Sequence, residues 1–593
     1  MQFKENRQPL KGSSIFIILL LFVFPETALS QTTYLPQGDK QNILLERLEI
    51  KSKTDSVLNF SKTRPLSRRA IFFKEVNLYG LTNHPIDTED PVLVKDTALA
   101  KQLSMSRVDM YNLRSAVLNN EEWIGNAPGG VRPPEFASKR PIWKSFYKTP
   151  ANLYEVHVHD FDLIVNPVFQ FVVSKESNND QRLFLNTRGV TVRGRIANKI
   201  GFAAYITDNQ ERDPLYVQQW INDRKAVPGA GLYKVFKAAG GVDYFDARGY
   251  FTFKAAKYID VAFGYDKNFI GNGHRSLFLS DFSNNNLFLK LNTRIWKLNY
   301  QNLFMELHSA HIPGGDKLIG KKYAAMHHLD LAVTKWLNIG VFEGIIFGRK
   351  DHFEFGYLNP VIFYRSIELQ NGSFDNSVAG LDLKANLAHR FQVYGQLLLD
   401  EFKLSEIKAG NGWWGNKYGI QAGAKYIDAF NIKNLDLQLE MNRVRPFTYS
   451  HNDSVANYTH YNQPLAHPLM ANFSEFIAIA RYQPAPKWLV QGELLFYKQG
   501  RDSGSRSFGS NIFLLNIPPY RTGDYGYDIG SGWQTNVSYA SLLISYELRE
   551  NLFLELFGVH RKQETKTAPV TSMSSTIFSF GIRWNMHRRE FDF

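Results

Sequence analysis

The stretch that decides the fold is Thr576–Met586, whose sequence is TIFSFGIRWNM. Apolar side chains such as Phe578 and Phe580 alternate in it with polar ones such as Arg583 and Asn585. Successive side chains of a β-strand point to opposite faces, so the stretch predicts a strand with one apolar and one polar surface. Such a strand belongs to a soluble sandwich, or to a transmembrane barrel whose apolar face contacts lipid and whose polar face lines the lumen.

Composition and the end of the chain favour the barrel. The chain has 593 residues, 14% of them aromatic, and its mean hydropathy is negative. Half of each barrel strand is polar, and aromatic residues mark both membrane interfaces, so these values suit a barrel. The last strand is followed closely by Phe593. A final amphipathic strand with a terminal aromatic residue resembles the closing strand of bacterial outer-membrane barrels.

The N-terminus has the features of a secretory signal. Three basic residues lie within the first eleven, and the apolar run Ile15–Phe24 follows them. That run is too short to span a bilayer as a helix. Small residues before Gln31 predict cleavage between Ser30 and Gln31. No later segment offers the roughly 20 consecutive apolar residues of a membrane helix, so a membrane location requires a closed barrel.

Residues 31–155 do not show the alternation of strands. Helices are predicted over 42–50, over 65–76 and from Ser106, where Ser106 and Asp109 form a capping-box pattern. The segment 126–134 is rich in Gly and Pro and indicates a linker. We therefore predict three parts: a signal peptide at 1–30, a small helical domain at 31–155, and a barrel at 156–593. The helical domain is expected to stay in the periplasm or to plug the lumen.

From about residue 163 onward the pattern has a period of two. The predicted strands are 164–173, 183–196, 199–207, 241–252, 258–265, 286–293, 297–308, 326–334, 338–347, 378–387, 391–400, 418–427, 435–443, 474–482, 488–498, 537–548, 551–562 and 574–586. They number about 18, and an even number is expected of a single-chain bacterial barrel.

Turn lengths then separate the two candidate folds. Short and long connections alternate in phase, and the long ones (208–240, 348–377, 444–473 and 499–536) all fall at the end opposite the termini. Short periplasmic turns and long outer loops are typical of outer-membrane barrels, whereas a sandwich has no reason to keep this phase. The predicted fold is an all-β transmembrane antiparallel barrel of about 18 strands with a small N-terminal α-helical periplasmic or plug domain.

Several short segments match motifs of a known protein family. The most specific is NGHRSLFLSD at 272–281, which contains Gly273, His274, Arg275, Ser276 and Asp281 and is predicted to lie in an outer loop. Weaker matches are FYKTPAN at 146–152, RG at 188–189 and 193–194, KIG at 199–201, YLNP at 357–360 and NRVRPF at 442–447. Together these segments resemble the capsule-assembly Wzi family, in the long form typical of Bacteroidetes. The resemblance implies a barrel with a helical periplasmic bundle that acts as an outer-membrane lectin for capsular polysaccharide. It does not imply which glycan, because the outer loops of such proteins differ greatly.

Candidate glycan-binding residues lie in the long loops. Sugar faces need flat apolar surfaces, and acidic sugars need cations, for which Arg offers a planar bidentate fork. The candidates are Trp413, Trp414, Arg443, Arg445, Tyr449, Tyr520, Arg521, Tyr525 and Tyr527. Structural alternatives exist for several of these groups. The Trp pair suits an interfacial girdle, Arg443, Arg445 and Tyr449 suit a structural Arg network in the lumen, and the His274 motif suits packing. Separately, Tyr394, Arg443 and Arg583 are bulky lumen candidates that favour a plugged lumen.

Other function classes have less support. No Gly-x-Ser-x-Gly elbow occurs, and His327 and His328 are adjacent in a strand and so point to opposite faces. We therefore expect no enzyme, cofactor or bound metal, and the export signal argues against nucleic acid despite the net charge of +13. The expected partners are surface or capsular polysaccharide, outer-membrane lipid and other envelope proteins. Two alternatives stay open: an accessory barrel of a surface secretion or gliding machine, and a diffusion porin.

Overall fold

The structure is a computed structural model of the chain. It describes residues 32–53, 58–71, 104–120, 122, 136–139 and 141–593, apart from residues 198, 237–239, 313–316, 351, 362, 373, 504–505 and 568. The predicted signal peptide, its cleavage site between Ser30 and Gln31, and the predicted linker at 126–134 lie outside the described residues. Among the described residues, no helix combines the length and apolar character needed to cross a membrane.

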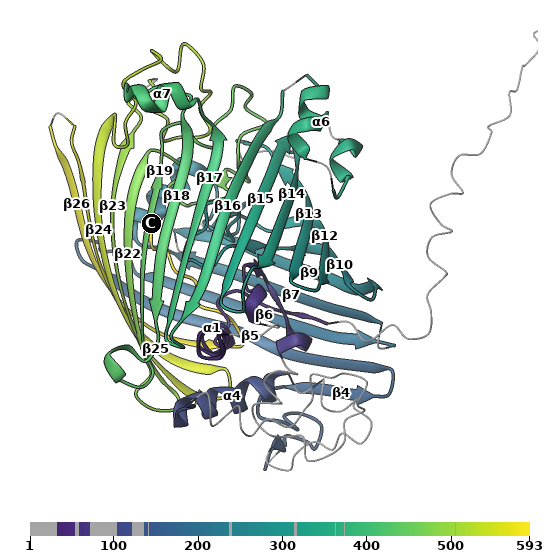
Figure 1. The fold of residues 1–593 in the computed structure, drawn as a ribbon. Coiled ribbons are helices and arrows are strands. Elements are labelled where there is room, and N and C mark those ends of the chain that lie inside the picture. Colours follow the sequence, from purple (N-terminus) through teal and green to yellow (C-terminus); the bar gives the residue numbers. More distant parts are fainter. Residues whose placement is uncertain are drawn as a thin grey trace, which may run out of the picture.

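Eighteen antiparallel strands of the described chain form a closed barrel (Figure 1). In chain order they are β5 (Phe161–Glu176), β6 (Leu183–Ile196), β7 (Ile200–Arg212), β9 (Gly241–Ala256), β10 (Ile259–Asp266), β12 (Asn286–Ile295), β13 (Leu298–His308), β14 (Lys321–Ala332), β15 (Leu337–Phe347), β16 (Asn376–Leu387), β17 (Phe391–Glu401), β18 (Lys417–Tyr426), β19 (Leu435–Val444), β22 (Phe473–Tyr482), β23 (Trp488–Arg501), β24 (Trp533–Arg549), β25 (Leu552–Thr565) and β26 (Thr571–Trp584). The barrel closes where β26 pairs with β5. Each predicted strand is confirmed, with ends shifted by a few residues.

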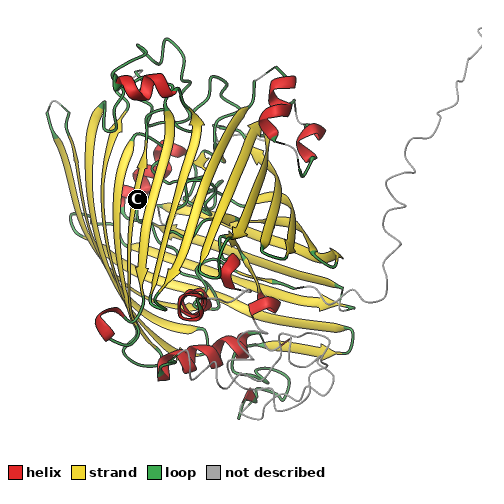
Figure 2. Cartoon of the chain, viewed as in Figure 1, coloured by secondary structure: helices red, strands yellow, loops and turns green. Residues whose placement is uncertain are grey.

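Shorter elements complete the fold. Two short strands extend the wall: β4 (Tyr154–Val158) pairs with β5, and β8 (Lys234–Phe236) pairs with β9. Three two-residue pairs lie elsewhere: β1 (Tyr34–Leu35) with β3 (Leu66–Ser67), β2 (Thr63–Arg64) with β11 (Phe269–Ile270), and β20 (Thr459–His460) with β21 (Gln463–Pro464). The helices are α1 (Gln41–Ser52), α4 (Arg107–Asn119), α5 (Leu215–Arg224), α6 (Tyr364–Gln370) and α7 (Leu404–Ala409), with single turns η2 (Leu58–Phe60), η5 (Phe355–Leu358) and η6 (Ala429–Asn431). Figure 2 shows them near the two ends of the barrel and within it.

The wall has the two surfaces that the alternation predicts. On β16, Leu381 and Leu383 are 51% and 45% exposed, whereas Asp382 and Lys384 between and beside them are 6% and 0% exposed. The neighbouring strands repeat this pattern. The outside of the barrel is therefore apolar and its lumen polar, as in barrels that stand in lipid.

The two ends of the barrel differ in their connections. One end carries the short turns, from the two-residue turn at 296–297 to the segment 427–434, and we call it the short-turn end. The other end carries the segments 213–240, 267–285, 348–375, 402–416, 445–472 and 502–532, and we call it the long-loop end. The predicted phase of short and long connections is confirmed.

The segment before the barrel enters the lumen at the short-turn end. Helix α1 lies inside the wall and α4 lies across the mouth (Figure 1). The helices predicted at 42–50 and from Ser106 are confirmed, and Ser106 and Asp109 form the predicted capping box. The helix predicted over 65–76 is confirmed only in part, because β3 occupies its first residues; beyond Ile71 it lies outside the described residues. We call α1 with its N-cap residue Lys40, together with residues 58–64, the N-terminal plug.

Residues 585–593, which we call the tail, also fill the lumen. The wall strand β26 ends at Trp584, and Asn585 has a left-handed backbone (φ 53°), which Asn tolerates. The chain then turns inward, and Phe593 is buried beside Trp220, Phe282 and Tyr216, with ring centroids 5.7, 5.7 and 6.1 Å away. Phe593 therefore lies in the lumen, beyond the end of the closing strand.

Candidate functional site

The loop cap is formed at the long-loop end by the segments 402–416, 445–472 and 502–532. Backbone hydrogen bonds join them: the Trp414 amide donates to the Asp524 carbonyl at 2.9 Å, and the Phe447 amide donates to the Gly509 carbonyl at 2.9 Å. Gly412 has φ +70°, and a Cβ on it would lie 2.8 Å from the Tyr527 nitrogen. The loops are therefore packed against one another closely enough to require glycine at this contact.

Arg445 holds the three segments of the loop cap together. Its guanidinium donates to the carbonyls of Asn416 at 2.8 Å, Trp413 at 3.3 Å and Tyr527 at 2.8 Å. A planar fork with five donors can satisfy several carbonyl groups at once. Since these bonds engage both Nε and one terminal nitrogen, the main role of Arg445 is to position the loops.

A second cation lies against the Trp pair. The Arg521 guanidinium carbon is 4.2 Å from the Trp414 ring centroid, and Arg521 donates to the Asn516 carbonyl at 2.9 Å and pairs with Asp524. The Trp414 ring also meets Phe447 edge-on at 6.0 Å. A cation over an indole face is a favourable contact, worth about 0.5–2 kcal/mol. Trp414 is thus packed inside the cap rather than placed in a girdle around the barrel.

The accessible part of the cap is aromatic and cationic. Tyr525 is 55% and Tyr520 36% exposed, and both lie in the segment that pairs with residues 411–414. Trp413 is half-buried, 6.1 Å from Trp414, with the exposed amine of Lys403 5.9 Å from its ring. Lys403 also pairs with Glu406 at 3.3 Å. Flat apolar rings beside an exposed cation can bind the faces and the acidic groups of sugars.

The structure brings together six of the nine candidate residues and places Tyr520 in the same cap. The six are Trp413, Trp414, Arg445, Arg521, Tyr525 and Tyr527; Tyr527 is buried and packs its ring 4.9 Å from Phe447. Tyr449 belongs to the segment 445–472 of the cap, but its side chain is buried in the lumen, where its hydroxyl donates to the Leu277 carbonyl at 2.8 Å.

Arg443 is the clearest error among the candidate residues. It was expected at a loop or in a lumen network, but it is exposed on the outer surface of the wall, where it pairs in register with the outward Ile420. Its neighbours Asn442 and Val444 are fully buried and face inward. The other two lumen residues named with it are placed correctly: Tyr394 donates to Glu440 at 2.7 Å, and Arg583 donates to Glu555 at 2.7 Å.

The resemblance motif at 272–281 does not lie in an outer loop. Its segment leaves the long-loop end but folds back into the lumen, where Phe278 stacks on Phe342 of β15 at 4.4 Å. Wall side chains hold its backbone: Glu440 accepts from the His274 amide at 2.7 Å, and Gln396 accepts from the Leu277 amide at 2.8 Å. A Cβ on Gly273 would lie 2.5 Å from the Glu440 carboxylate. The motif is buried structure, as its alternative interpretation held.

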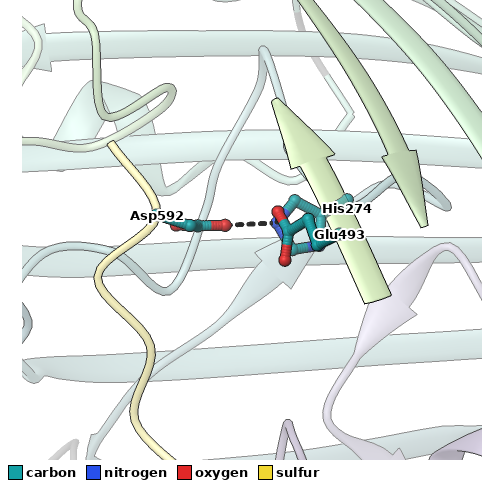
Figure 3. A group of neighbouring side chains, drawn as sticks. All are labelled: His274, Glu493 and Asp592. Carbon is teal, nitrogen blue, oxygen red and sulfur yellow. Dashed lines mark hydrogen bonds and ion pairs between the residues drawn. The ribbon is translucent and has the colours of Figure 1, made fainter. Parts of the chain in front are cut away.

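The charged residues of the motif bind the tail (Figure 3). His274 Nε2 lies 2.6 Å from Asp592 Oδ2, and the Arg275 guanidinium donates to Asp592 Oδ1 at 3.0 Å. Ser276 donates to the Ile270 carbonyl at 2.5 Å, and the Asp281 carbonyl accepts from Lys267 at 2.9 Å. Burial opposes the charged forms, but the partners outweigh it: the pKa of Asp592 is lowered and the pKa of His274 is raised.

His274, Asp592 and Glu493 also have the spacing of a metal-ligand set among the described residues. Both oxygens of Asp592 are, however, already bonded to His274 and Arg275. A guanidinium in contact with a carboxylate competes with a metal ion for the same oxygens. The group is therefore better suited to hold the tail than to hold a metal, and the expectation of no metal stays a prediction.

A polar cavity of about 500 Å³ lies in the lumen between the N-terminal plug and the tail. Lys40 and Glu46 of the N-terminal plug line one side, Arg588 and Asp592 of the tail line another, and Glu555 belongs to the wall. Sequence reasoning singled out His274 and Arg275 as motif residues but did not find the tail residues that they bind. The signal that could have found them is the run HRREFDF at 587–593, which breaks the alternation of the last strand.

Known proteins share the fold. No protein-family model matches the chain, and no curated protein sequence matches it. Among solved structures it is similar to Wzi, an outer membrane protein involved in group 1 capsule assembly in Escherichia coli and described as a carbohydrate-binding β-barrel, with a TM-score of 0.51 and 12% identity over 94% of this chain and 100% of that chain. Pseudomonas aeruginosa OprD follows with 0.40 and 12% over 76% and 97%, and P. aeruginosa OccK8 (OprE) with 0.41 and 8% over 72% and 98%.

Proposed function

We propose that the protein is a Wzi-like outer-membrane barrel that holds a surface or capsular polysaccharide at its long-loop end. In this proposal the long loops face the surroundings of the cell and the N-terminal plug faces the periplasm. The observation that carries it is the loop cap, in which Trp413, Tyr520 and Tyr525 offer ring faces beside Lys403 on a rigid base fastened by Arg445.

The filled lumen supports an anchor more than a diffusion porin. The N-terminal plug occupies the short-turn end, and the tail and the segment 267–285 occupy the interior beneath the cap. The likeness to Wzi, whose description names carbohydrate binding, supports the same choice. An accessory role in a secretion or gliding machine would depend on protein contacts, and the cap's sugar-sized aromatic faces favour a glycan instead. No catalytic step or cofactor is part of the proposal.

The test is polysaccharide binding by cap variants. We expect Trp413→Ala with Tyr525→Ala to weaken retention of purified capsule by about tenfold, equivalent to about 1.4 kcal/mol. The matched control is Trp143→Ala, which removes an exposed Trp near the short-turn end. Binding is measured on intact cells and by calorimetry on the detergent-solubilised barrel.

The outcomes separate the alternatives. Equal binding by the cap variant, the control and the unaltered protein would remove the cap from the proposal. Unchanged capsule retention after deletion of the whole protein would favour the machine-accessory role. A conductance that depends on solute size, measured on the unaltered protein in planar bilayers, would favour the porin.

A further inference from the structure

One long connection, the segment 348–375 between β15 and β16, touches the loop cap near its two ends, where Gly348 lies against Val455 and Phe374 meets His451 edge-on at 6.4 Å, but it forms a folded unit of its own. It contains η5 and α6, and Figure 1 shows α6 beside the upper ends of β14–β16, away from α7. Its two ends are tied together, because the Arg349 guanidinium donates to both carboxylate oxygens of Asp375 at 2.7 and 2.6 Å. The Tyr357 hydroxyl donates to the same carboxylate at 2.7 Å. We call this folded unit the flap.

The flap packs on the outside of the wall. Phe342 and Ile346 of β15 belong to the core inside the lumen, so the alternate residues Glu343, Ile345 and Phe347 point outward. These outward residues are nevertheless buried, and the flap covers them. Phe347 lies 4.7 Å from Tyr357 between ring centroids. On β13, the outward Tyr300 donates its hydroxyl to the Pro360 carbonyl at 2.5 Å.

The flap covers a row of polar side chains on the outside of the wall, at positions where a lipid-facing wall has apolar residues. Asn302, His327 and Glu343 stand opposite one another on β13, β14 and β15, and all three are buried. The Tyr364 ring lies 4.0 Å from the His327 ring, and the Arg365 amide donates to Glu343 at 3.2 Å. Polar groups on a barrel exterior are costly in contact with acyl chains. The flap removes this contact by covering the row.

The flap itself presents apolar side chains to the outside. Val361 is 83% and Phe363 62% exposed, and Phe355, Leu369 and Phe374 are exposed as well. This surface continues the apolar outside of the wall, where Ile339, Val341 and Leu381 stand exposed beside the flap. A contiguous exposed apolar surface of this kind marks an interaction site.

Strand length fixes the depth of the flap. Strands β13, β14 and β15 have 11, 12 and 11 residues. A tilted membrane-crossing strand needs about 9–11 residues, so these three strands are long enough to cross the bilayer. The flap packs on the outward Phe304, Tyr323, Ile345 and Phe347, which lie in the half of these strands nearer the long-loop end. Because irregular backbone is not tolerated in the hydrocarbon centre, the flap belongs at the boundary of headgroups and acyl chains.

We propose that the flap is a lipid-binding element: Val361, Phe363 and Phe355 insert among the acyl chains of the leaflet at the long-loop end, while Asn302, His327 and Glu343 dock it on the wall. This rests on the membrane location within the proposed function and is independent of glycan binding. The occupant of the apolar surface is membrane lipid, because the surface is continuous with the lipid-facing wall and lies at membrane depth.

The chain contains no cysteine, so single-cysteine variants can be labelled at one site only. The test variants are Phe363→Cys and Val361→Cys, each labelled with an environment-sensitive fluorophore and reconstituted in phosphatidylcholine vesicles. Phe578→Cys on the lipid-facing side of β26 is the membrane control, and Tyr525→Cys in the loop cap is the aqueous control. Spin-labelled phospholipid is the quencher.

We expect the labels at 361 and 363 to lose emission to the same extent as the label at 578, while the label at 525 is unaffected. Labels at 361 and 363 that behave like the one at 525 would overturn the flap proposal. Disulfide formation between two Val361→Cys chains in vesicles would also overturn it, since a second copy would then cover the surface. Absence of quenching at 578 would instead contradict the membrane location itself. The Val361 variant replaces a side chain that is almost fully exposed, so it is expected to leave the packing unchanged.

Discussion

The N-terminal plug and the tail both fill the lumen, but different interactions hold them. The plug is fastened by ion pairs to the wall and its turns: Lys40 binds Glu547 and Glu550 at 2.6 and 2.5 Å, Arg47 binds Asp428 at 2.9 Å, and Lys384 of β16 binds Glu49. The tail is fastened mainly by rings, with Phe593 among Trp220, Phe282 and Tyr216. Its ion pairs, at Asp592 and between Arg589 and Glu211, are fewer.

The difference follows from what each segment meets. The plug meets the polar inner face of the wall, where apolar side chains would leave buried charges unpaired. The tail meets α5 and the segment 267–285, which bring their own aromatic residues into the lumen. The plug should therefore respond most to the loss of a charge, and the tail to the loss of a ring.

The largest effect is expected from Lys384→Met. Lys384 is fully buried, and besides Glu49 it donates to the Asn59 carbonyl at 2.6 Å and the Ser61 hydroxyl at 3.1 Å. Removing one partner of a buried pair leaves an uncompensated charge and costs about 3–5 kcal/mol. We expect the plug to loosen, measured as faster tryptic cleavage within residues 40–69 of the detergent-solubilised barrel.

The matched control is Lys403→Met, which removes an exposed lysine of the loop cap. An exposed pair of this kind contributes at most about 1 kcal/mol, so plug cleavage should not change. Equal cleavage in Lys384→Met and the unaltered protein would mean that the wall does not hold the plug through this contact.

Phe593→Ala should have a smaller effect, confined to the tail. Truncating a buried Phe costs about 3 kcal/mol, and partial repacking of the neighbouring rings reduces the loss. Trypsin cuts after Arg588 or Arg589 only when the tail leaves its site, so the mass of the intact barrel reports docking. Phe578→Ala, which removes a lipid-facing ring of β26, is the control. A tail that stays protected in Phe593→Ala would show that its ion pairs suffice, and the contrast with the plug would fail.

The wall was predictable from sequence because both of its signals are local. Alternation with period two and the lengths of the turns gave each of the 18 strands. The alternation also indicated the correct face for Arg443. Leu439 and Met441 lie four and two residues before it in the same strand, so they share its face, and both point outward. The expectation that Arg443 faced the lumen ignored that parity.

The contents of the lumen and the flap were not predictable in the same way. The length of a connection indicates at which end of the barrel it lies. It does not indicate whether the connection folds away from the barrel, into the lumen or onto the outside of the wall. The segment 267–285 folds inward because Glu440, Gln396 and Gln421 on distant strands accept or donate to its backbone. Such pairings depend on which strands face one another across the lumen. The grouping of Trp414 with Arg521 has the same origin, since they lie on different loops.

The smallest effect is expected from a change of pH on docking of the tail. It sharpens the contrast between plug and tail because pH acts only on the ion pairs of the tail and not on its aromatic contacts. Burial lowers the pKa of His274, but the hydrogen bond and charge of Asp592, with Glu493 nearby, raise it above the ordinary 6.5. A group with a raised pKa in the folded state stabilises that state fully below its ordinary pKa and ceases to do so as the pH rises through the raised value. For Asp592 burial opposes ionisation, but Arg275 and His274 lower the pKa, so its contribution is present above the ordinary carboxyl range and is lost only in acid. The tail should therefore dock most firmly between these limits and become more accessible as the pH rises from neutral through the raised pKa of His274.

The measurement is tryptic cleavage after Arg588 and Arg589 across that range, normalised at each pH to cleavage of an unfolded standard. In His274→Gln the imidazole is absent while a side chain able to donate to Asp592 is kept, so cleavage should depend less on pH than in the unaltered protein. The aromatic contacts of Phe593 do not titrate, so they should keep the tail partly docked throughout. If the unaltered protein and His274→Gln give the same profile, the His274–Asp592 pair does not contribute to docking, and the tail would then be held by its rings and by Arg275 and Arg589 alone.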